Sequence, residues 1–228
     1  MKNFEKELLI LSNLLIKEFN EEKINAMLER MKNEYEKIIP EIPYIGGYKN
    51  PMTLLLISGM SDLAIFRTLE KEGFTLREIG QLFYKFSDER NKRRKKNLEK
   101  TGKDPSNYPF ELEYMDITKK LSEHSQKKEY PDDWTSDYIE GDGKSFEWGF
   151  NFHQCGINNV YKRLGAEKYI PFICLSDFSE ANILGFGFSR TQTLGNGDPI
   201  CDHRYIKNYK TPQAWPPDKL KEFKLKLD

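Results

Sequence analysis

The segment Cys174–Arg204, CLSDFSEANILGFGFSRTQTLGNGDPICDHR, concentrates the residue types that perform chemistry in proteins. It holds two of the three cysteines of the chain, one of its three histidines, several acids and two arginines. The 228-residue chain is otherwise rich in Lys and Glu, which mostly occupy solvent-exposed surface. A segment of this density is where a functional site is expected first.

The same segment predicts a β-hairpin. Leu184, Phe186 and Phe188 alternate with small residues, which is typical of a strand with one bulky face. Residues 195–199, GNGDP, supply the positive-φ positions that a chain reversal needs. Residues 200–205 then form the return strand, and the glycines leave room over the small face for a ligand or a helix.

The return strand separates its four chemically interesting side chains into two pairs. Side chains alternate along a strand, so Cys201 and His203 share one face of the sheet. Asp202 and Arg204 share the opposite face. No more than two of these four side chains can therefore point directly into one pocket.

A strand and two helices are predicted upstream of the hairpin. Aromatic residues at positions 146, 148, 150 and 152 alternate with smaller or polar ones, which indicates a strand with an aromatic core face. The opposite face carries His153, and Cys155 follows in the same phase before a short helix that ends near Gly165. Pro171 begins the next helix, on which Cys174 and Asp177 are three residues apart and share a face.

The first half of the chain predicts helices only. Asn50-Pro51 is a helix start, with an N-cap followed by proline, and Gly73 is placed to end that helix. Thr75 and Glu78 have the spacing of a capping box. The expected helices cover residues 4–19, 21–38, 51–72, 75 to beyond 86, and 109–126.

Residues 127–143 are rich in Pro, Gly and Asp and predict a loop, which is the best domain boundary in the chain. We therefore expect an α+β protein with a helical region over residues 1–126, a loop over 127–143 and an α+β region over 144–228. A single compact domain is the alternative.

Composition limits the partners. Lys plus Arg and Asp plus Glu number 36 each, so no global field favours nucleic acid or an anionic membrane. The basic run at 91–103 lacks aromatics and has acids beside it, which indicates a solvated helix end and loop. No apolar run reaches membrane-spanning length, since 54–60 is short and interrupted by Ser58-Gly59. We expect no nucleic-acid or membrane partner; a homo-oligomer remains open.

Cysteine usage indicates the compartment. Three cysteines is an odd number and all follow residue 150, so no disulfide framework is expected and a reducing cytoplasm fits the chain. The N-terminus has an apolar centre, but Ser12 and Asn13 interrupt it and no small-residue cleavage site follows. We interpret it as an amphipathic helix.

Several of these motifs occur together in one known family. The run RTQTLGNGDPICDHR at 190–204, with the upstream Cys155 and Cys174-x-x-Asp177, resembles the L-2-amino-thiazoline-4-carboxylic acid hydrolase family. In the first half, residues 62–73 look like the helical segment of that family. The resemblance implies hydrolysis of a C–N or C–S bond in a small heterocycle.

The C-terminal part also resembles the wider 4-vinyl-reductase ligand-binding fold, through the Gly197-Asp198-x-x-Cys201 turn. This resemblance implies a small antiparallel sheet in an α+β part, with the N-terminal helical bundle packed on it. Phenol-sensing members of the wider group bind zinc through an acid and a cysteine three residues apart on the first hairpin strand. This chain has Arg190 and Thr193 there, so zinc is a minority interpretation and no cofactor is expected.

The residues suggest a thiol mechanism for the substrate class that the resemblance implies. Cys174 is the preferred nucleophile, because a helix N-terminus lowers a thiol pKa, and Cys155 is the next candidate. The remaining expected roles are proton transfer by His153 or His203, a substrate-carboxylate contact by Arg190, hydrogen bonds to the ring from Thr191 or Thr193, and orientation by Asp177 and Asp202, with Cys201 close by.

Each of these residues also has a structural interpretation. A free cysteine is commonly a small buried hydrophobe, and a histidine on a strand is commonly a hydrogen-bonded part of the scaffold. Zinc could be bound by side chains of the types found at Cys155, Cys174, Cys201, His153 and His203. No Cys-x-x-Cys or His-x-x-x-His pair, however, places two such ligands close together in the sequence. The competing hypothesis of function is a 4-vinyl-reductase-like module that binds a small apolar molecule without catalysis.

Overall fold

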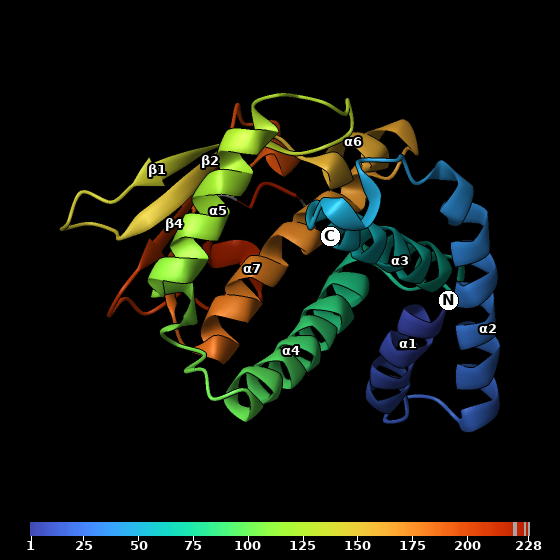
Figure 1. Ribbon diagram of the computed structural model, residues 1–228. Helices are drawn as coiled ribbons and strands as arrows, with labels where there is room; N and C mark the ends of the chain where they lie inside the picture. Colours follow the sequence, from blue (N-terminus) through green and yellow to red (C-terminus); the bar gives the residue numbers. More distant parts are fainter. Residues whose placement is uncertain (221–222, 226, 228) are drawn as a thin grey trace.

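The structure is a computed structural model and describes residues 1–220, 223–225 and 227. It is an α+β fold in which helices lie against one small antiparallel sheet (Figure 1). The helices are α1 (Lys2–Leu15), α2 (Glu21–Ile38), α3 (Met52–Lys71), α4 (Leu76–Lys100), α5 (Leu112–Ser125), α6 (Gly156–Arg163) and α7 (Ile170–Leu184). The strands are β1 (Thr135–Glu140), β2 (Trp148–Gln154), β3 (Gly187–Ser189) and β4 (Cys201–Ile206).

Helix ends follow the capping signals of the sequence. The Thr75 hydroxyl accepts a hydrogen bond from the Glu78 backbone N–H, and the Glu78 carboxylate accepts one from the Thr75 N–H, so the capping box of α4 is formed. The helix continues to Lys100, so most of the basic run at 91–103 is helical rather than loop. Gly185 takes a left-handed conformation (φ 94°) and ends α7.

The sheet has the strand order β1-β2-β4-β3 and every neighbouring pair is antiparallel. Two boundaries differ from the sequence prediction. The expected loop at 127–143 contains β1, which pairs with β2 along its length. The expected first hairpin strand is shorter than predicted, because Leu184 still belongs to α7 and only Gly187–Ser189 is strand.

Two clusters of buried side chains hold the fold together. The first joins α1–α4 to α6 and α7 and includes Phe66 and Tyr161. The second joins the sheet to α7 and includes Trp148 and Phe188. Trp215, in the C-terminal segment, packs against both clusters, so the helical and α+β regions are in direct contact.

Helix α3 is the central helix of the first cluster. By length and composition it could cross a membrane, contrary to the sequence expectation, but 61% of that window is buried inside the protein. Burial of this kind is what the core helix of a globular fold shows, so the window is weak evidence for a membrane span.

Candidate functional site

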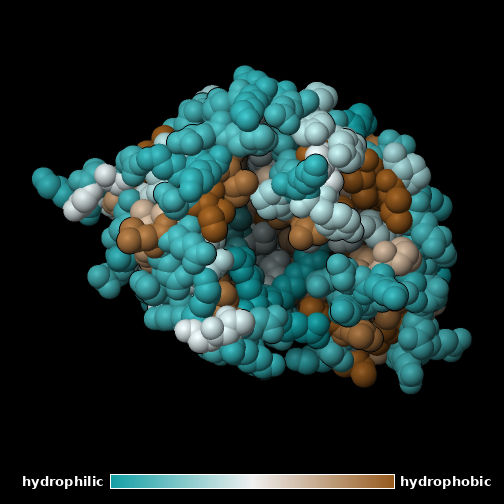
Figure 2. Space-filling view, in the orientation of Figure 1, coloured by the Kyte–Doolittle hydropathy of each residue, from teal (hydrophilic) through white to brown (hydrophobic). Residues whose placement is uncertain are grey.

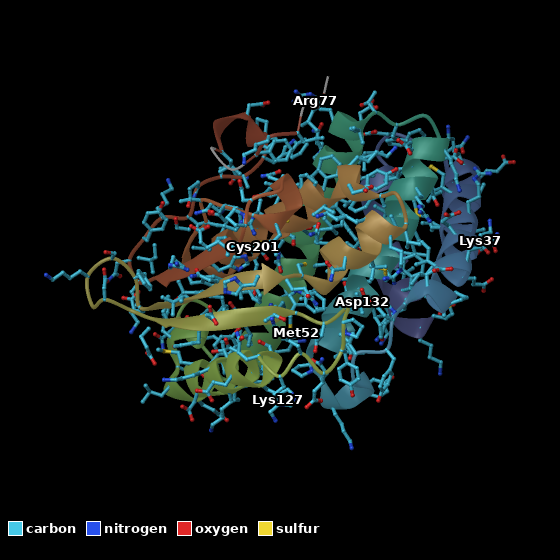
Figure 3. The ribbon with its side chains drawn as sticks, turned by 90° about the horizontal axis from the view of Figure 1, so that it is seen from above. Lys37, Met52, Arg77, Lys127, Asp132 and Cys201 are labelled. Atoms are coloured by element: carbon cyan, nitrogen blue, oxygen red, sulfur yellow. The ribbon has the colours of Figure 1, made fainter. Side chains whose placement is uncertain are left out.

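A cavity of about 990 Å³ lies between the sheet, α5, α7, the start of α3 and the segment 44–51. The face of the molecule in Figure 2 is hollowed near its centre, where Figure 1 shows α5, α7 and the start of α3. Met52 and Cys201, which Figure 3 labels, are far apart in the sequence and both line this cavity.

Strand alternation decides which sheet residues reach the cavity. Cys201, His203 and Tyr205 of β4 line it, together with Phe150 and Phe152 of β2. The register pairs Phe152 with Cys201 and Phe150 with His203, so these side chains lie next to each other on one face.

The opposite face of the sheet is occupied by Asn151, Asp202 and Arg204. The Arg204 guanidinium donates to the Asn151 side-chain oxygen at 2.9 Å and packs over the Phe146 ring. This confirms the predicted division of the return strand into a Cys201–His203 face and an Asp202–Arg204 face.

Three free thiols meet at one end of the cavity. Cys174 comes from α7, Cys201 from β4, and Cys155 from the junction of β2 and α6. The Thr193 hydroxyl oxygen lies 3.5 Å from the sulfurs of both Cys174 and Cys201. The Cys201 sulfur also accepts a hydrogen bond from the Leu194 backbone N–H at 3.2 Å. Sequence positions 155, 174 and 201 are thus brought to one place by the fold.

Burial keeps these sulfurs protonated. It raises the pKa of Cys155 and of Cys174 to about 12, and it also raises the pKa of Cys201. The Arg190 charge opposes the rise in the pKa of Cys174, and the backbone N–H groups of Asn158 and Ile157 oppose it at Cys155.

The expected lowering of the Cys174 pKa by a helix N-terminus is therefore wrong. Helix α7 begins at Ile170, and only the first four N–H groups of a helix lack partners inside it. Cys174 is the fifth residue, and the loss of water contact at its sulfur outweighs the helix dipole.

Arg190, Asp177 and His203 form a second cluster beside the thiols. The Arg190 guanidinium donates to Asp177 Oδ2 at 2.6 Å and to the Cys174 carbonyl oxygen at 2.8 Å. It also lies over the rings of Phe178 and Phe188. The Arg190 side chain is only 1% exposed, whereas that of Asp177 is 37% exposed. Arg190 is thus enclosed and donates to protein groups, and its contact with a substrate carboxylate stays a prediction.

His203 is held as a neutral imidazole. Its Nε2 lies 3.3 Å from Arg190 Nη1, and because a guanidinium only donates, Nε2 is the acceptor and the proton sits on Nδ1. Burial, and then the charges of Arg190 and Arg204, hold the pKa of His203 well below its usual value of 6.5.

Four of the predicted site residues do not line the cavity, although one of them, Thr193, contacts two of the thiols. His153 points to the other side of the sheet and pairs with Asp137 at 2.7 Å in an exposed position. Asp202 accepts hydrogen bonds from the Thr191 hydroxyl and backbone N–H, at 2.6 and 2.8 Å, and so fixes the loop after β3. His153, Thr191, Thr193 and Asp202 are absent from the cavity wall.

Several wall residues had no individual signal in the sequence. Tyr114 and Leu121 come from α5, Trp134 precedes β1, and Ile173 belongs to α7. Tyr205 could have been found, because it follows Cys201 and His203 in strand phase. The wall residues of α5 could not have been found, since periodicity predicts which face of a helix is buried but not whether that face lines a core or a cavity.

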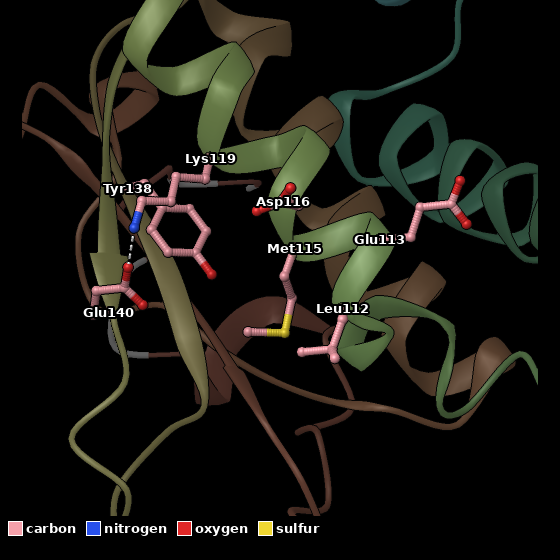
Figure 4. Close-up of a pocket in the computed structure, with 7 residues that line it drawn as sticks. All are labelled: Leu112, Glu113, Met115, Asp116, Lys119, Tyr138 and Glu140. Atoms are coloured by element: carbon pink, nitrogen blue, oxygen red, sulfur yellow. Dashed lines mark hydrogen bonds and ion pairs between the residues drawn. The ribbon is translucent and has the colours of Figure 1, made fainter.

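A smaller, open pocket of about 440 Å³ lies between α5 and β1 (Figure 4). Lys119 and Glu140 form an ion pair across it, Tyr138 lies beside this pair, and Glu113 points away. It contains no thiol or histidine. Among the residues that the structure describes, no three of His, Cys, Asp or Glu are placed to hold a metal ion.

Fold and site together define an α+β protein with a thiol-lined cavity. A family model described as L-2-amino-thiazoline-4-carboxylic acid hydrolase matches residues 55–205. The match covers more than half of the chain and includes all three cysteines, so the chain belongs to this family. No curated protein and no solved structure gave a significant match.

Proposed function

We propose that the protein hydrolyses a C–N or C–S bond of a small heterocycle in this cavity, with a cysteine as nucleophile. Family membership supports the reaction class. The observation that carries the mechanism is the meeting of the three thiols with the Arg190–Asp177 pair at one end of the cavity. Nucleophilic catalysis needs an attacking atom beside groups that orient the substrate, and this end supplies both.

Cys174 is our preferred nucleophile. Its sulfur faces the cavity within hydrogen-bonding distance of the Thr193 hydroxyl, and the Arg190 charge favours its thiolate. Its pKa of about 12 keeps it a thiol at neutral pH, so its proton must leave during the attack. An amidine-type nitrogen of the substrate can take that proton itself, which removes the need for a histidine base.

The reaction balances with one water molecule. The thiol sulfur adds to the ring carbon between sulfur and nitrogen, the C=N π bond breaks, and the thiol proton passes to that nitrogen. The adduct then expels the ring sulfur, which takes a proton from an amino nitrogen as C=N re-forms, and the C–S bond is broken. If the adduct expels the ring nitrogen instead, the C–N bond is broken. Water then adds to the same carbon, and the enzyme sulfur leaves with a proton.

Asp177 and Arg190 have complementary roles in this proposal. Arg190 fixes the Asp177 carboxylate, and the exposed part of that carboxylate accepts an N–H from the substrate. Thr193 positions the sulfurs of Cys174 and Cys201. His203, whose Nε2 accepts from Arg190, acts on the site through that residue rather than as a base.

A second candidate function is a binding module without catalysis. The observation in its favour is the wall of the cavity, in which aromatic and aliphatic side chains outnumber polar ones near the sheet. The cysteines would then serve as packing groups, which is the commoner role of a buried thiol.

The test is ring opening of 2-aminothiazoline-4-carboxylate and related cyclic isothioureas, followed as a mass gain of one water. We expect Cys174→Ala to lose about a thousandfold in turnover or more, because the attacking atom is gone. Cys155→Ala and Cys201→Ala serve as matched controls and should stay within about tenfold of the parent. Near-UV circular dichroism confirms that each variant is folded.

Other outcomes decide between the alternatives. Full turnover in Cys174→Ala contradicts our choice, and loss in Cys155→Ala alone would name Cys155 as the nucleophile. Absence of turnover in the parent protein, with tight binding of small apolar compounds, would favour the binding module.

A further inference from the structure

The cavity is larger than the proposed reaction needs. Its volume of about 990 Å³ is at the upper end of the roughly 300–1,000 Å³ of drug-sized ligand sites. A single five-membered ring with one carboxylate would occupy only the thiol end. The remaining space has room for a further group on the ligand.

The space beyond the thiols has an apolar, rigid wall. Phe150, Phe152 and Tyr205 cover the sheet side, and none of the three is fully buried by other protein groups. The Tyr205 ring stacks on that of its register partner Trp148, with centroids 4.0 Å apart and an angle of 4° between the planes, so a buried neighbour on the same face fixes it. From the other side Tyr114 and Leu121 of α5 face this wall. An apolar group placed here would remove this surface from water.

The charged groups of the cavity do not favour an anionic ligand. Arg190, the cation at the thiol end, is 1% exposed and donates to Asp177 and to the Cys174 carbonyl. The lysines of the cavity wall, Lys49 and Lys128, are solvent-exposed and belong to the segments at its rim. Asp177, in contrast, keeps 37% of its side chain exposed at the thiol end, and a carboxylate has about four acceptor sites.

We infer that the natural substrate is an amphiphilic molecule with an N–H-bearing, amidine-like head and an apolar aryl or alkyl arm. The head lies at the thiols and donates to Asp177, and the arm lies between α5 and the aromatic face of the sheet. A carboxylate on the ring is not required. This inference rests on the proposed function for the chemistry of the head, whereas the arm follows from the cavity wall.

The test compares the affinities of three 2-aminothiazolines that carry hydrogen, a carboxylate or a phenyl group at ring position 4. Titration calorimetry with Cys174→Ala measures binding without turnover. We expect the phenyl compound to bind at least about tenfold more tightly than either of the others, since binding removes the apolar surface of the phenyl ring from water. This comparison needs no variant of the cavity wall.

Variants on one helix then locate the arm. Leu121→Trp fills the space beside the sheet and should weaken binding of the phenyl compound about tenfold while leaving the unsubstituted head within about twofold. Leu112→Trp is the matched control, because Leu112 is 84% exposed on the same helix and outside this cavity. Asp177→Asn should weaken all three compounds by a similar factor.

The outcomes separate this inference from the proposed function. Tighter binding of the carboxylate than of the phenyl compound, or no binding of any compound, overturns the inference. If the parent protein turns over the carboxylate compound and the phenyl compound binds no more tightly than the others, the hydrolase proposal stands and the apolar arm is contradicted. If the phenyl compound binds tightly but no compound is turned over, the apolar arm is supported and the hydrolase proposal is contradicted.

Discussion

Arg190 organises the polar end of the cavity because an enclosed guanidinium must have its charge and its donors satisfied. Its two terminal nitrogens contact the Asp177 carboxylate, the Cys174 carbonyl and the His203 imidazole. Through these contacts one side chain ties α7 to both strands of the hairpin. The pKa of His203 is low first because its own ring is buried, and the nearby positive charge of Arg190 lowers it further by disfavouring imidazolium.

The first prediction concerns the charge of His203. Because burial and Arg190 lower its pKa in the folded state, we expect its ring to stay neutral between pH 8 and pH 5, although Asp177 lies 3.9 Å from Nε2 and acts in the opposite direction. NMR titration of the three histidine rings should show one that does not shift, and His203→Gln should remove that signal. A His203 signal that titrates near pH 6.5 would contradict the acceptor role of Nε2.

The same pKa shift affects stability with a definite sign. The unfolded state binds a proton at His203 near pH 6.5, whereas the folded state does not. The stabilising contribution is therefore complete above about pH 6.5 and is lost as the pH falls towards the folded-state pKa. The slope is at most about 1.4 kcal/mol per pH unit, the value for one proton. His203→Gln should flatten the fall in the free energy of unfolding between pH 6.5 and pH 5.

Sequence reasoning at this scale succeeded where local geometry decides and failed where packing decides. Strand alternation predicted the shared face of Cys201 and His203. It misplaced Cys155 relative to His153, because the chain leaves the strand at Gln154 and Cys155 turns to the cavity. The pKa of Cys174 and the enclosure of Arg190 depend on what covers them, which no spacing reveals.

Among the elements, α3 and α6 approach closely at one glycine. A β-carbon on Gly59 would lie 2.7 Å from Cδ1 and 2.8 Å from Cγ1 of Ile157, which are impossible contacts. The Tyr161 hydroxyl donates to the Gly59 carbonyl at 2.7 Å and fixes the same crossing. Since Ile157 also lines the cavity, the α3–α6 contact positions part of the ligand site.

At this scale we predict that the effect of Gly59→Ala on the free energy of unfolding depends on the residue at position 157. Gly59→Ala should lower the free energy of unfolding by about 1–3 kcal/mol, because the new methyl group overpacks the helix crossing. In an Ile157→Ala background the clashing atoms are absent, and the same change should be neutral or stabilising by up to about 1 kcal/mol through helix propensity. Urea unfolding of the four proteins gives the coupling energy. An equal cost of Gly59→Ala in both backgrounds would contradict the close approach.

Most elements were predictable because their ends carry local signals. The capping box at Thr75 and the glycine at position 73 after α3 act through hydrogen bonds within a few residues. Strand β1 was missed because Pro131, Gly141 and the acids around it favour a loop locally. Its pairing with β2 is a tertiary interaction that outweighs local preference.

Over the whole molecule, the division at residues 127–143 does not separate two cores. Side chains of α6 and α7 complete the cluster that α1–α4 begin, and Tyr84 of α4 belongs to the cluster of the sheet. Trp215 stacks near Tyr84 and meets Phe172, so the C-terminal segment spans both clusters. Because each region contributes side chains to the cluster of the other, we propose that they fold together as a single compact domain.

The last prediction follows from this shared core. All three tryptophans lie after residue 126, at 134, 148 and 215, whereas most of the helix lies before it. Tryptophan fluorescence therefore reports the α+β region, and far-UV circular dichroism mainly reports the helical one. In urea the two signals should change in one coincident transition, since loss of either region exposes the core of the other. Gly59→Ala should move both midpoints together, although its contact joins two helices and lies outside the sheet. A fluorescence transition that precedes the loss of helix, or moves without it, would mean that the residues after 143 unfold as a separate domain and that the cavity lies on a division of the fold.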